Sequence, residues 1–527
     1  MHGRTAAKVN ELIVIDSIAR IVNPPWRMLT STRGYTVFIV GYFVAALLVR
    51  FLLYPGASQD DAEQLVFMQT LAGGYNPAQP PLYTWLIWAC ARIVGPNLLA
   101  VLIVKYACLT ATYLLMAAAA RIILRDMRLG NLAGLGLFGL LWLGYDALFN
   151  YSNTIVETTA IAATLYALAL LVGASDRRHY LLLGVTVGLG LLTKYAYLLF
   201  LVPLLASALT LPVFRARLLD RRLLLAVLPV VVLLLPHGVW AIIGDLNLQK
   251  TYSDRLQQPT LGYGEGVQRG FIKMANGILV FLSPLIVIGP LLLPAIFRRR
   301  FSPETELRPW RLLLERYLLA LVAMLSVAIV ALGMANVRTH YFFVLIAAPI
   351  WLILTGRLSR SHPLRFRGLA FILLCLAVGW LGALVGRYWI DVTMSQPRVY
   401  FNFPYPAFAA AIRETGFERG TMIAFVQRYD IAGNLRNQFP EARVYSLKYP
   451  WFKAPLAHRR DGKCLLVWTG RAGKRGETAA RRAALSRFGA SIPAKAKIHQ
   501  SILPVPPSRS LKMTLNWIVT PASGRCR

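Results

Sequence analysis

Residues 35–64, YTVFIVGYFVAALLVRFLLYPGASQDDAEQ, place a long apolar stretch directly before a cluster of acidic side chains. As a helix, the apolar part at residues 35–54 is long enough to cross about 30 Å of hydrocarbon. Asp60, Asp61 and Glu63 follow shortly after its end. Ionised groups near a membrane cost free energy unless they are paired or used. This junction therefore predicts a membrane protein with a polar site next to its first span.

The composition supports a membrane protein for the whole chain of 527 residues. Hydrophobic residues make up 57% and charged residues 15%, whereas a soluble domain carries about 25% charged residues, and the mean hydropathy is +0.53. These values exclude a row of soluble domains. The net charge of +34 would suggest nucleic acid in a soluble chain, but in a membrane chain Lys and Arg collect in loops, so no nucleic-acid partner is expected.

Eleven stretches are apolar enough to be interpreted as membrane spans. They lie near residues 35–54, 98–120, 131–149, 153–173, 180–193, 195–211, 222–243, 271–297, 313–333, 341–356 and 368–387. Residues 82–95 are apolar but number only about 14, so we interpret them as a surface helix within the first outer loop, residues 55–97. The predicted fold is an α-helical polytopic membrane protein.

The loop charges predict the orientation. The N-terminal segment, residues 1–34, and the loops on its side hold 23 Lys and Arg, whereas the loops between spans on the other side hold 6. Since Lys and Arg collect in cytoplasmic loops, we expect the N-terminus in the cytoplasm and the loop 55–97 outside. The first 34 residues contain no cleavable apolar core, so the first span is expected to remain as an anchor.

After the membrane module, residues 35–387, the chain turns polar, and residues 388–527 are expected to form a small soluble α/β domain on the outer side. Residues 422–426, 444–447 and 465–468 resemble strands, and residues 406–415 and 477–488 resemble helices. This domain holds 23 Lys and Arg against 7 Asp and Glu, a net charge of +16. Large translocated domains do not follow the positive-inside rule, so the basic surface predicts an acidic partner.

The five cysteines, Cys90, Cys108, Cys375, Cys464 and Cys526, have no CxxC or His-linked spacing. The spacing therefore predicts neither a zinc site nor a disulfide framework.

Two interpretations fit the acidic cluster of the first outer loop. In the first, Ser58 or Asp60 caps a helix whose first turn is acidic, and no further role is needed. In the second, the same helix start also presents Asp60 as a general base. Asp146 and Glu157 lie near the outer ends of two later spans and could face the same site, although capping of helix ends explains them equally well.

Three motifs carry a resemblance to a known family. They are the acidic pair Asp60-Asp61 followed about twenty residues later by Pro80-Pro81-Leu82-Tyr83-Thr84-Trp85-Leu86, then Gly188-Leu189-Gly190-Leu191-Leu192-Thr193-Lys194, and Arg338-Thr339-His340-Tyr341. Over about residues 35–360 the chain resembles the polyprenyl-phosphate-sugar-dependent GT-C glycosyltransferases. Within them it is most similar to the branch of protein O-mannosyltransferase-like enzymes, lipid A aminoarabinose transferases and rhizobial lipopolysaccharide galacturonosyltransferases.

The resemblance implies roles for individual residues. Asp60 matches the catalytic aspartate of the family, and Asp61 stands where many members have Glu. Gln79 stands where some members have a Lys that meets the donor phosphate, so other cations would have to supply that charge. The candidate set is Asp60, Asp61 and Glu63 for catalysis, with Lys194, Arg255, Arg338, His340, Gln79 and Tyr83 for donor phosphate or substrate and Asp146 and Glu157 as additional acids. For Lys194 a lysine snorkelling at a helix end, and for His340 a satisfied interfacial histidine, stay alternatives.

The predicted function is a glycosyltransferase of the inverting kind in a bacterial inner membrane. It would move a hexosyl or uronosyl group from a polyprenyl-phosphate donor to an envelope glycolipid, lipopolysaccharide core or lipid A, on the periplasmic side. A transporter or lipid flippase and a protein O-glycosyltransferase are the alternatives. We expect a monomer in the lipid bilayer with no cofactor and no metal, although Asp60, Asp61 and Glu63 could also form a hard-oxygen site for a divalent cation. The donor sugar stays open.

Overall fold

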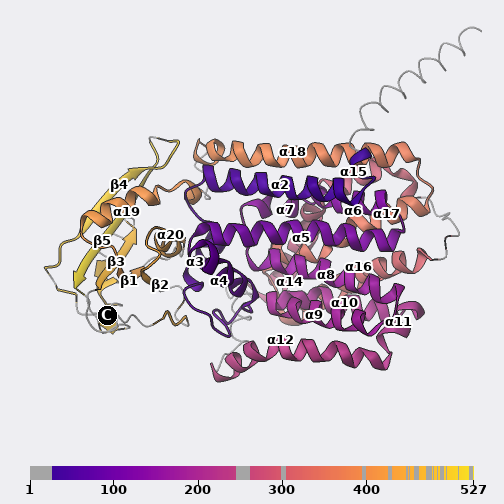
Figure 1. The fold of residues 1–527 in the computed structure, drawn as a ribbon, viewed down its shortest axis with the longest axis horizontal. Helices are drawn as coiled ribbons and strands as arrows, with labels where there is room; N and C mark the ends of the chain where they lie inside the picture. The colour runs from indigo at the N-terminus through magenta and orange to yellow at the C-terminus, as the bar shows by residue number, and fades with distance from the viewer. Residues whose placement is uncertain are drawn as a thin grey trace, which may run out of the picture.

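The computed structural model describes residues 26–244, 261–297, 304 and 306–393, and most of residues 399–526. Long helices run side by side along the length of the molecule, and a small sheet lies at one end of this bundle (Figure 1). The first helix, α2 (Thr32–Leu53), is capped by the Ser31 hydroxyl, which accepts the Gly34 N–H at 3.0 Å. The bundle of apolar helices confirms a mostly helical membrane protein.

Within the described residues, seven helices are long and apolar enough to cross a membrane, and a bent pair adds an eighth span if its two helices are counted as one. The seven are α2, α5 (Leu98–Leu124), α8 (Asn153–Gly173), Arg221–Ile243 with α12 (Leu224–Ile243), α16 (Arg308–Leu332), Thr339–Leu358 with η6 (Thr339–Ala347) and α17 (Ala348–Leu358), and Pro363–Ile390 of α18 (Pro363–Thr393). The bent pair joins η3 (Tyr195–Tyr197) and α10 (Leu198–Leu209) to α11 (Pro212–Leu218) at 112°. The count of eleven spans stays a prediction.

Two of the expected spans are broken rather than continuous. Residues 131–149 form α6 (Met127–Leu135), η1 (Gly136–Gly139), α7 (Leu141–Gly144) and η2 (Asp146–Leu148), and residues 271–297 form α14 (Tyr263–Leu282), α15 (Leu285–Leu292) and η5 (Pro294–Phe297). The breaks contact each other, since the Leu141 N–H donates to the Ser283 carbonyl at 2.7 Å. Pro284 offers no N–H, so a helix cannot continue through it unchanged, and the freed backbone groups at membrane depth need such partners.

The first outer loop is helical at two places. α3 (Gln59–Phe67) contains the acidic cluster, and α4 (Leu82–Val94) occupies the short apolar stretch. The helix expected at residues 82–95 is therefore confirmed, whereas its position on a membrane surface stays a prediction. α9 (Arg177–Thr193) ends at Lys194, where the chain becomes extended before it enters η3.

The C-terminal residues build a five-stranded sheet in the order β2-β1-β3-β5-β4. The strands are β1 (Gly420–Ala424), β2 (Arg443–Ser446), β3 (Lys463–Thr469), β4 (His499–Pro504) and β5 (Lys512–Pro521), and the helices are α19 (Tyr405–Glu414) and α20 (Asp430–Gln438). β1 pairs in parallel with β2 and β3, and β5 pairs antiparallel with β3 and β4. The small α/β unit and its three expected strands are confirmed, while β4, β5 and α20 are additional elements. Every described position within residues 477–488 is helical, in agreement with the helix expected there.

The expectation of no disulfide needs a correction. Cys464 on β3 and Cys526 near the C-terminus form a disulfide across a sequence separation of 62 residues. No local spacing motif marks such a pair, because only the folded sheet brings its two ends together. Cys90, Cys108 and Cys375 are free.

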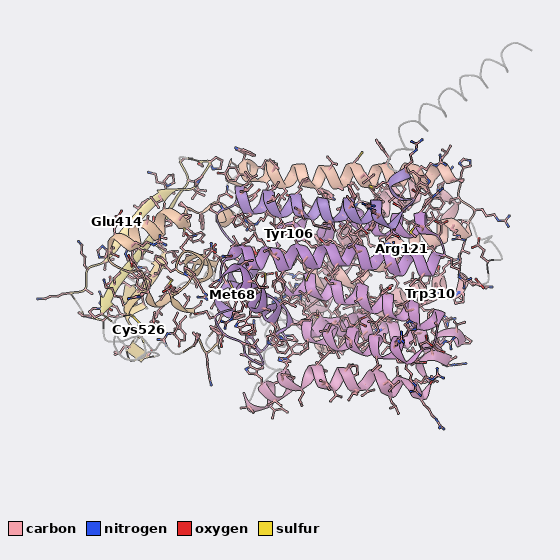
Figure 2. The ribbon with its side chains drawn as sticks, viewed as in Figure 1. Met68, Tyr106, Arg121, Trp310, Glu414 and Cys526 are labelled. Atoms are coloured by element: carbon pink, nitrogen blue, oxygen red, sulfur yellow. A yellow bond between two sulfur atoms is a disulfide. The ribbon has the colours of Figure 1, made fainter. Side chains whose placement is uncertain are left out.

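The described parts of the basic loops assigned to one side lie together at one end of the bundle. Arg121 and Trp310 lie at the end away from the sheet, whereas Glu414 and Cys526 lie at the sheet end (Figure 2). Contacts between separate loops hold the basic end together: Arg357 Nε lies 3.3 Å from Glu304 Oε2, and Arg222 donates to the Ser175 carbonyl at 2.6 Å. Met68, just after α3, lies toward the sheet end (Figure 2).

Candidate active site

The acidic cluster forms the first turn of α3. The Ser58 hydroxyl caps this helix and accepts the Asp61 N–H at 3.0 Å, as the capping interpretation of the sequence predicted. Carboxylates in a first turn are favoured by the positive end of the helix dipole. Capping therefore explains why the acids are tolerated here, and their individual surroundings show what else they can do.

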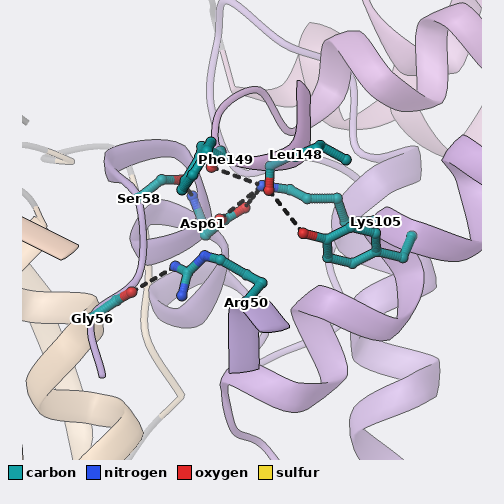
Figure 3. A network of polar contacts seen from close by, with 8 residues as sticks. Arg50, Gly56, Ser58, Asp61, Lys105, Leu148 and Phe149 are labelled. Carbon is teal, nitrogen blue, oxygen red and sulfur yellow. Dashed lines mark hydrogen bonds and ion pairs between the residues drawn. The ribbon is translucent and has the colours of Figure 1, made fainter. Parts of the chain in front are cut away.

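Asp61 is fully buried and paired with a lysine of a membrane helix. Lys105 Nζ of α5 lies 2.6 Å from Asp61 Oδ1 and 2.7 Å from Oδ2, and both side chains have no exposed surface (Figure 3). Lys105 Nζ is also 3.4 Å from the Phe149 carbonyl oxygen. Asp61 therefore fixes α3 against α5. Lys105 was missing from the sequence-based candidates, although a lysine inside an apolar span is a strong signal for a buried partner.

A second buried cation holds the turn between α2 and α3. Arg50 donates to the Gly56 carbonyl at 2.6 Å (Figure 3) and also to the Tyr54 carbonyl at 3.1 Å. Its guanidinium also lies over the Phe401 ring, 5.0 Å from the ring centroid. Because these bonds fix the chain just before Ser58, Arg50 helps to set where α3 begins.

Asp60 differs from Asp61 because its side chain stays partly exposed. Desolvation by the surrounding protein raises the pKa of Asp60, and the negative charges of Asp61 and Asp146 raise it further. Lys105 and Lys194 oppose this shift. A carboxylate with a raised pKa is a better proton acceptor near neutral pH, so Asp60 has the chemistry of a general base.

Lys194 lies beside this acid at the end of α9. Its Nζ donates to the Thr154 hydroxyl at 2.8 Å and lies 4.0 Å from Glu157 Oε2. Lys194 is buried, so the alternative of a lysine snorkelling to solvent does not describe it. A buried ammonium group within electrostatic reach of Asp60 can stabilise a phosphate by charge-assisted hydrogen bonds.

The additional acids lie near the same place. The charge of Asp146 acts on Asp60, and Asp146 Oδ1 accepts a hydrogen bond from Asn150 Nδ2 at 2.7 Å. Glu157 is fully buried on α8, and neither of its carboxylate oxygens has a hydrogen-bond partner among the described residues. The fold thus brings Asp60, Asp146, Glu157 and Lys194 together, as the sequence predicted for a compact bundle.

The rest of the first outer loop is held by amide and hydroxyl contacts. Asn76 Nδ2 donates to Glu63 Oε1 at 3.2 Å, so Glu63 is turned toward its own loop and is buried. Asn153 Nδ2 of α8 donates to the Gln79 side-chain oxygen. The Thr84 hydroxyl donates to Gln64 Oε1 at 2.6 Å. Gln79 therefore contributes an uncharged amide at this position.

A histidine of α12 connects this loop to the residue after Lys194. His237 Nδ1 lies 2.9 Å from the Gly73 carbonyl oxygen, and Nε2 lies 3.0 Å from the Tyr195 hydroxyl. The Trp240 ring stacks on His237, with centroids 5.5 Å apart. A Cβ at Gly74 would clash with that indole, so glycine is required for this approach. Nothing in the sequence pattern identified His237.

The remaining candidates are placed less closely around Asp60. Tyr83 of α4 is fully buried, its hydroxyl has no hydrogen-bond partner among the described residues, and it interacts electrostatically with both Asp60 and Asp61. Arg338 is exposed and His340 half-buried at the start of η6, where Arg338 lies within electrostatic reach of Lys273. Arg255 lies outside the described residues.

The acids do not converge as metal ligands. In the described part of the chain, no group of three or more His, Cys, Asp or Glu side chains could hold a metal ion. Asp61 faces Lys105, and Glu63 accepts from Asn76.

Comparisons with known proteins agree on one class. Residues 78–240 match the family model described as dolichyl-phosphate-mannose-protein mannosyltransferase. The lipopolysaccharide core galacturonosyltransferase RgtA of Rhizobium johnstonii is 30% identical over 473 residues, which cover 87% of this chain and 90% of RgtA. RgtB of the same organism, also a lipopolysaccharide core galacturonosyltransferase, is 27% identical over 434 residues, 82% of this chain and 86% of RgtB.

A solved structure shares the fold. The crystal structure of ArnT from Cupriavidus metallidurans bound to undecaprenyl phosphate superimposes with a TM-score of 0.59 over 92% of this chain and 98% of that chain. The sequence identity is 13%, so this likeness concerns the fold alone.

Proposed function

Because the chain belongs to the GT-C glycosyltransferase branch of the rhizobial lipopolysaccharide galacturonosyltransferases, we propose that it transfers a sugar from a polyprenyl-phosphate donor to an envelope glycolipid. The observation that carries this proposal is the contrast within the acidic pair. Asp60 is partly exposed with a raised pKa, whereas Asp61 is buried against Lys105. One acid is thus available for chemistry and the other holds it in place.

Asp60 acts as the general base in the proposed reaction. It takes the proton of the acceptor hydroxyl while the acceptor oxygen bonds to the anomeric carbon and the bond from that carbon to the phosphate oxygen breaks. A single displacement of this kind inverts the configuration at the anomeric carbon. Asp61 positions Asp60 through α3, and Glu63 orders the loop that follows, so we assign both to the catalytic loop without contact to the reacting atoms.

The leaving phosphate needs cations, because Gln79 carries no charge. Lys194 is the best placed, since it is buried and its charge acts on Asp60. Arg255, Arg338 and His340 are proposed to add to the donor site when the lipid binds. The Tyr83 hydroxyl, which has no hydrogen-bond partner among the described residues, is available near the acids, Asp146 would orient the acceptor, and Glu157 would pair with Lys194 until the donor phosphate binds. No metal ion is required in this scheme.

The donor and acceptor classes follow from relatives. Undecaprenyl phosphate occupies the ArnT structure, and RgtA and RgtB act on lipopolysaccharide core with galacturonic acid, as their names state. A polyprenyl-phosphate-linked uronic acid is therefore the first donor to test. The net charge of +16 on residues 388–527 favours an acidic acceptor such as lipopolysaccharide core or lipid A.

The proposed orientation places the sheet end in the periplasm of a bacterial inner membrane. The Cys464–Cys526 disulfide fits an oxidising compartment, and the basic loops lie at the opposite end of the bundle. Residues 1–34 would then lie in the cytoplasm, residues 35–387 in the membrane with eleven spans, and residues 388–527 in the periplasm. Protection of Cys464 and Cys526 from a thiol reagent in intact cells until a reductant is added would support this placement. Reaction without the reductant would contradict it.

The test of the reaction is Asp60→Asn in the purified, full-length protein in proteoliposomes. The substitution preserves shape and removes the base, so transfer of labelled galacturonic acid from polyprenyl phosphate to lipopolysaccharide should fall by roughly 10²–10⁴-fold. Asp126→Asn is the matched control, because Asp126 is likewise an aspartate at the start of a helix, where it accepts the Leu129 N–H at 2.9 Å, but it lies in a loop of the basic end. Undiminished transfer by Asp60→Asn would remove Asp60 from the mechanism. Translocation of lipid without glycosidic bond formation would favour a transporter or flippase instead.

A further inference from the structure

The first outer loop and the C-terminal unit share one hydrophobic core. Val66, Phe67 and Tyr75 of the loop belong to the same buried cluster as the residues that line the sheet and α19. The Phe67 ring lies 4.9 Å from that of Tyr449 and 5.2 Å from that of Phe452, centroid to centroid. The loop therefore contributes side chains to the core of the C-terminal unit, and the two parts are not independent bodies.

Helix α20 packs directly on the backbone of α3. A Cβ at Gly433 would clash with the backbone of Ala62, which is two residues from Asp60. Such a close approach of two helices transmits small shifts, because packed interiors have little free volume. Any side chain at position 433 would have to push α3 or α20 aside.

Asn434 joins this contact to the start of the catalytic helix. Its Oδ1 accepts the Ala57 N–H at 2.6 Å, and its Nδ2 donates to the Asp430 carbonyl at 2.8 Å and lies 3.4 Å from the Ala57 carbonyl. Ala57 directly precedes the cap residue Ser58. Asn434 is buried and contacts both the N–H and the carbonyl of Ala57, the residue that leads into α3.

Three further hydrogen bonds, made by two side chains, complete the attachment. Arg436 Nε donates to the Leu65 carbonyl at 2.8 Å, near the end of α3. The side-chain amide of Gln69 binds the edge strand β2 as the peptide group of a neighbouring strand would. Its Oε1 accepts the Val444 N–H at 2.7 Å, and its Nε2 donates to the Val444 carbonyl at 3.0 Å. The beginning, middle and end of α3 are thus each held by the C-terminal unit.

From these contacts we propose that α20 is the positioning element of the catalytic loop, with Asn434 and Gly433 as positioning residues that set the place and solvation of Asp60. This inference rests on the proposed role of Asp60 as the base. It assigns to the C-terminal unit a part in the chemical step, in addition to any part in binding the acceptor.

The test compares Asn434→Ala and Gly433→Ala with Asn516→Ala. Asn516 is also buried in the C-terminal unit, where its Oδ1 accepts from Gln500 between β4 and β5, but it lies in the sheet and has no bond to α3. We expect kcat of Asn434→Ala and Gly433→Ala to fall on the order of 10–100-fold, since misplacement by about 1 Å has that effect, with the donor KM changing less. The acid limb of the pH profile should move to lower pH because Asp60 becomes better solvated. Asn516→Ala should retain activity.

A second readout does not depend on the reaction. Hydrogen exchange of a peptide covering residues 56–68 should accelerate in Asn434→Ala and stay unchanged in Asn516→Ala, because only the former frees the Ala57 N–H. If wild-type protein shows no transfer but the exchange result holds, the proposed reaction fails and the attachment stands. Equal exchange in both variants, or equal loss of kcat at equal folded fraction, overturns the positioning role. Should Asn434→Ala fail to fold, Gln69→Ala removes the β2 bond from the loop side and is judged by the same two readouts.

Discussion

Two buried lysine–carboxylate pairs each have a lysine within electrostatic reach of Asp60, and the geometry of the two pairs differs. Lys105 and Asp61 are 2.6 Å apart with no exposed surface on either side chain. Lys194 and Glu157 are 4.0 Å apart, with 10% of the Lys194 side chain exposed. In a close pair the two charges stabilise each other and hold two helices together. In a loose pair the electrostatic attraction is weaker, so the lysine can leave the carboxylate and bind a ligand instead. On the proposed mechanism, this difference separates the residues that hold the site together from those that bind the substrate.

The largest effect should come from breaking the close pair. Lys105→Met leaves the Asp61 carboxylate buried without its ion-pair partner, which costs about 3–5 kcal/mol in similar cases. We expect a large drop in the midpoint of thermal unfolding in detergent and little folded protein. The double variant Lys105→Met with Asp61→Leu removes both charges and should recover much of the midpoint. A single variant as stable as the wild type would show that the pair has no structural role.

Breaking the loose pair should affect the reaction and leave the fold intact. Lys194→Met removes the proposed phosphate ligand, so kcat/KM should fall by roughly 10²–10³-fold, the loss typical for one charge-stabilising donor. Thermal unfolding should change far less than in Lys105→Met. Lys194→Arg keeps the charge and is the control that should retain part of the activity. If the loss of activity merely follows the loss of folded protein, Lys194 belongs with the structural pair.

Replacing the carboxylate of each pair by an amide tests the difference between the two pairs further. Glu157→Gln removes a carboxylate that competes for Lys194, so the donor KM should fall by a few-fold, the order expected for a loosely paired charge. Asp61→Asn should instead destabilise the protein, because it leaves Lys105 buried and uncompensated. Donor titrations and thermal unfolding of both variants decide this. A higher donor KM in Glu157→Gln would mean that the carboxylate orients Lys194 rather than competes for it.

The smallest effect concerns pH. The pKa of Asp60 is raised above that of an ordinary aspartate, and the base works only when ionised, so activity should be lost as the pH falls through this raised value. Because the charge of Asp146 raises the pKa of Asp60, Asp146→Asn should move the acid limb of kcat/KM to lower pH by a fraction of a unit, in the usual range for a screened charge. An acid limb at the pH of an unperturbed carboxylate would contradict this account.

The sequence predicted the helical membrane class, the first outer loop and the neighbourhood of the acids, because apolar length and clustered charge are local properties. Asp60 and Lys194 each follow an apolar stretch, and the fold brings their charges within electrostatic reach of each other. Lys105, Arg50 and His237 were missed, although each is a polar residue within an apolar stretch. Their partners, Asp61, Gly56 and Gly73, are distant in the chain or are backbone carbonyls, which no residue pattern marks.

The C-terminal unit also shows that contacts between distant residues cannot be predicted from local sequence patterns. β1 to β3 were recognised as short apolar runs, yet β4 alternates between half-buried and exposed positions and gives a weak signal. The sequence predicted one span at residues 131–149, because hydropathy does not reveal where a helix breaks. The break is stabilised by a backbone hydrogen bond to a second break, at Ser283, which is distant in the sequence. The disulfide was missed for the same reason, since its two cysteines meet only through the strand order.

The bond between Ala57 and Asn434 spans 377 residues. At about 5–20 residues per second, a ribosome needs roughly 20–75 s to pass from one to the other. During that interval the membrane helices can insert and pack, but the loop that holds Asp60 still lacks the partner that completes its core. On the proposed mechanism, the site around Asp60 is therefore completed last, when most of the chain has been made, and a chain that ends before Asn434 lacks the side chain that binds Ala57.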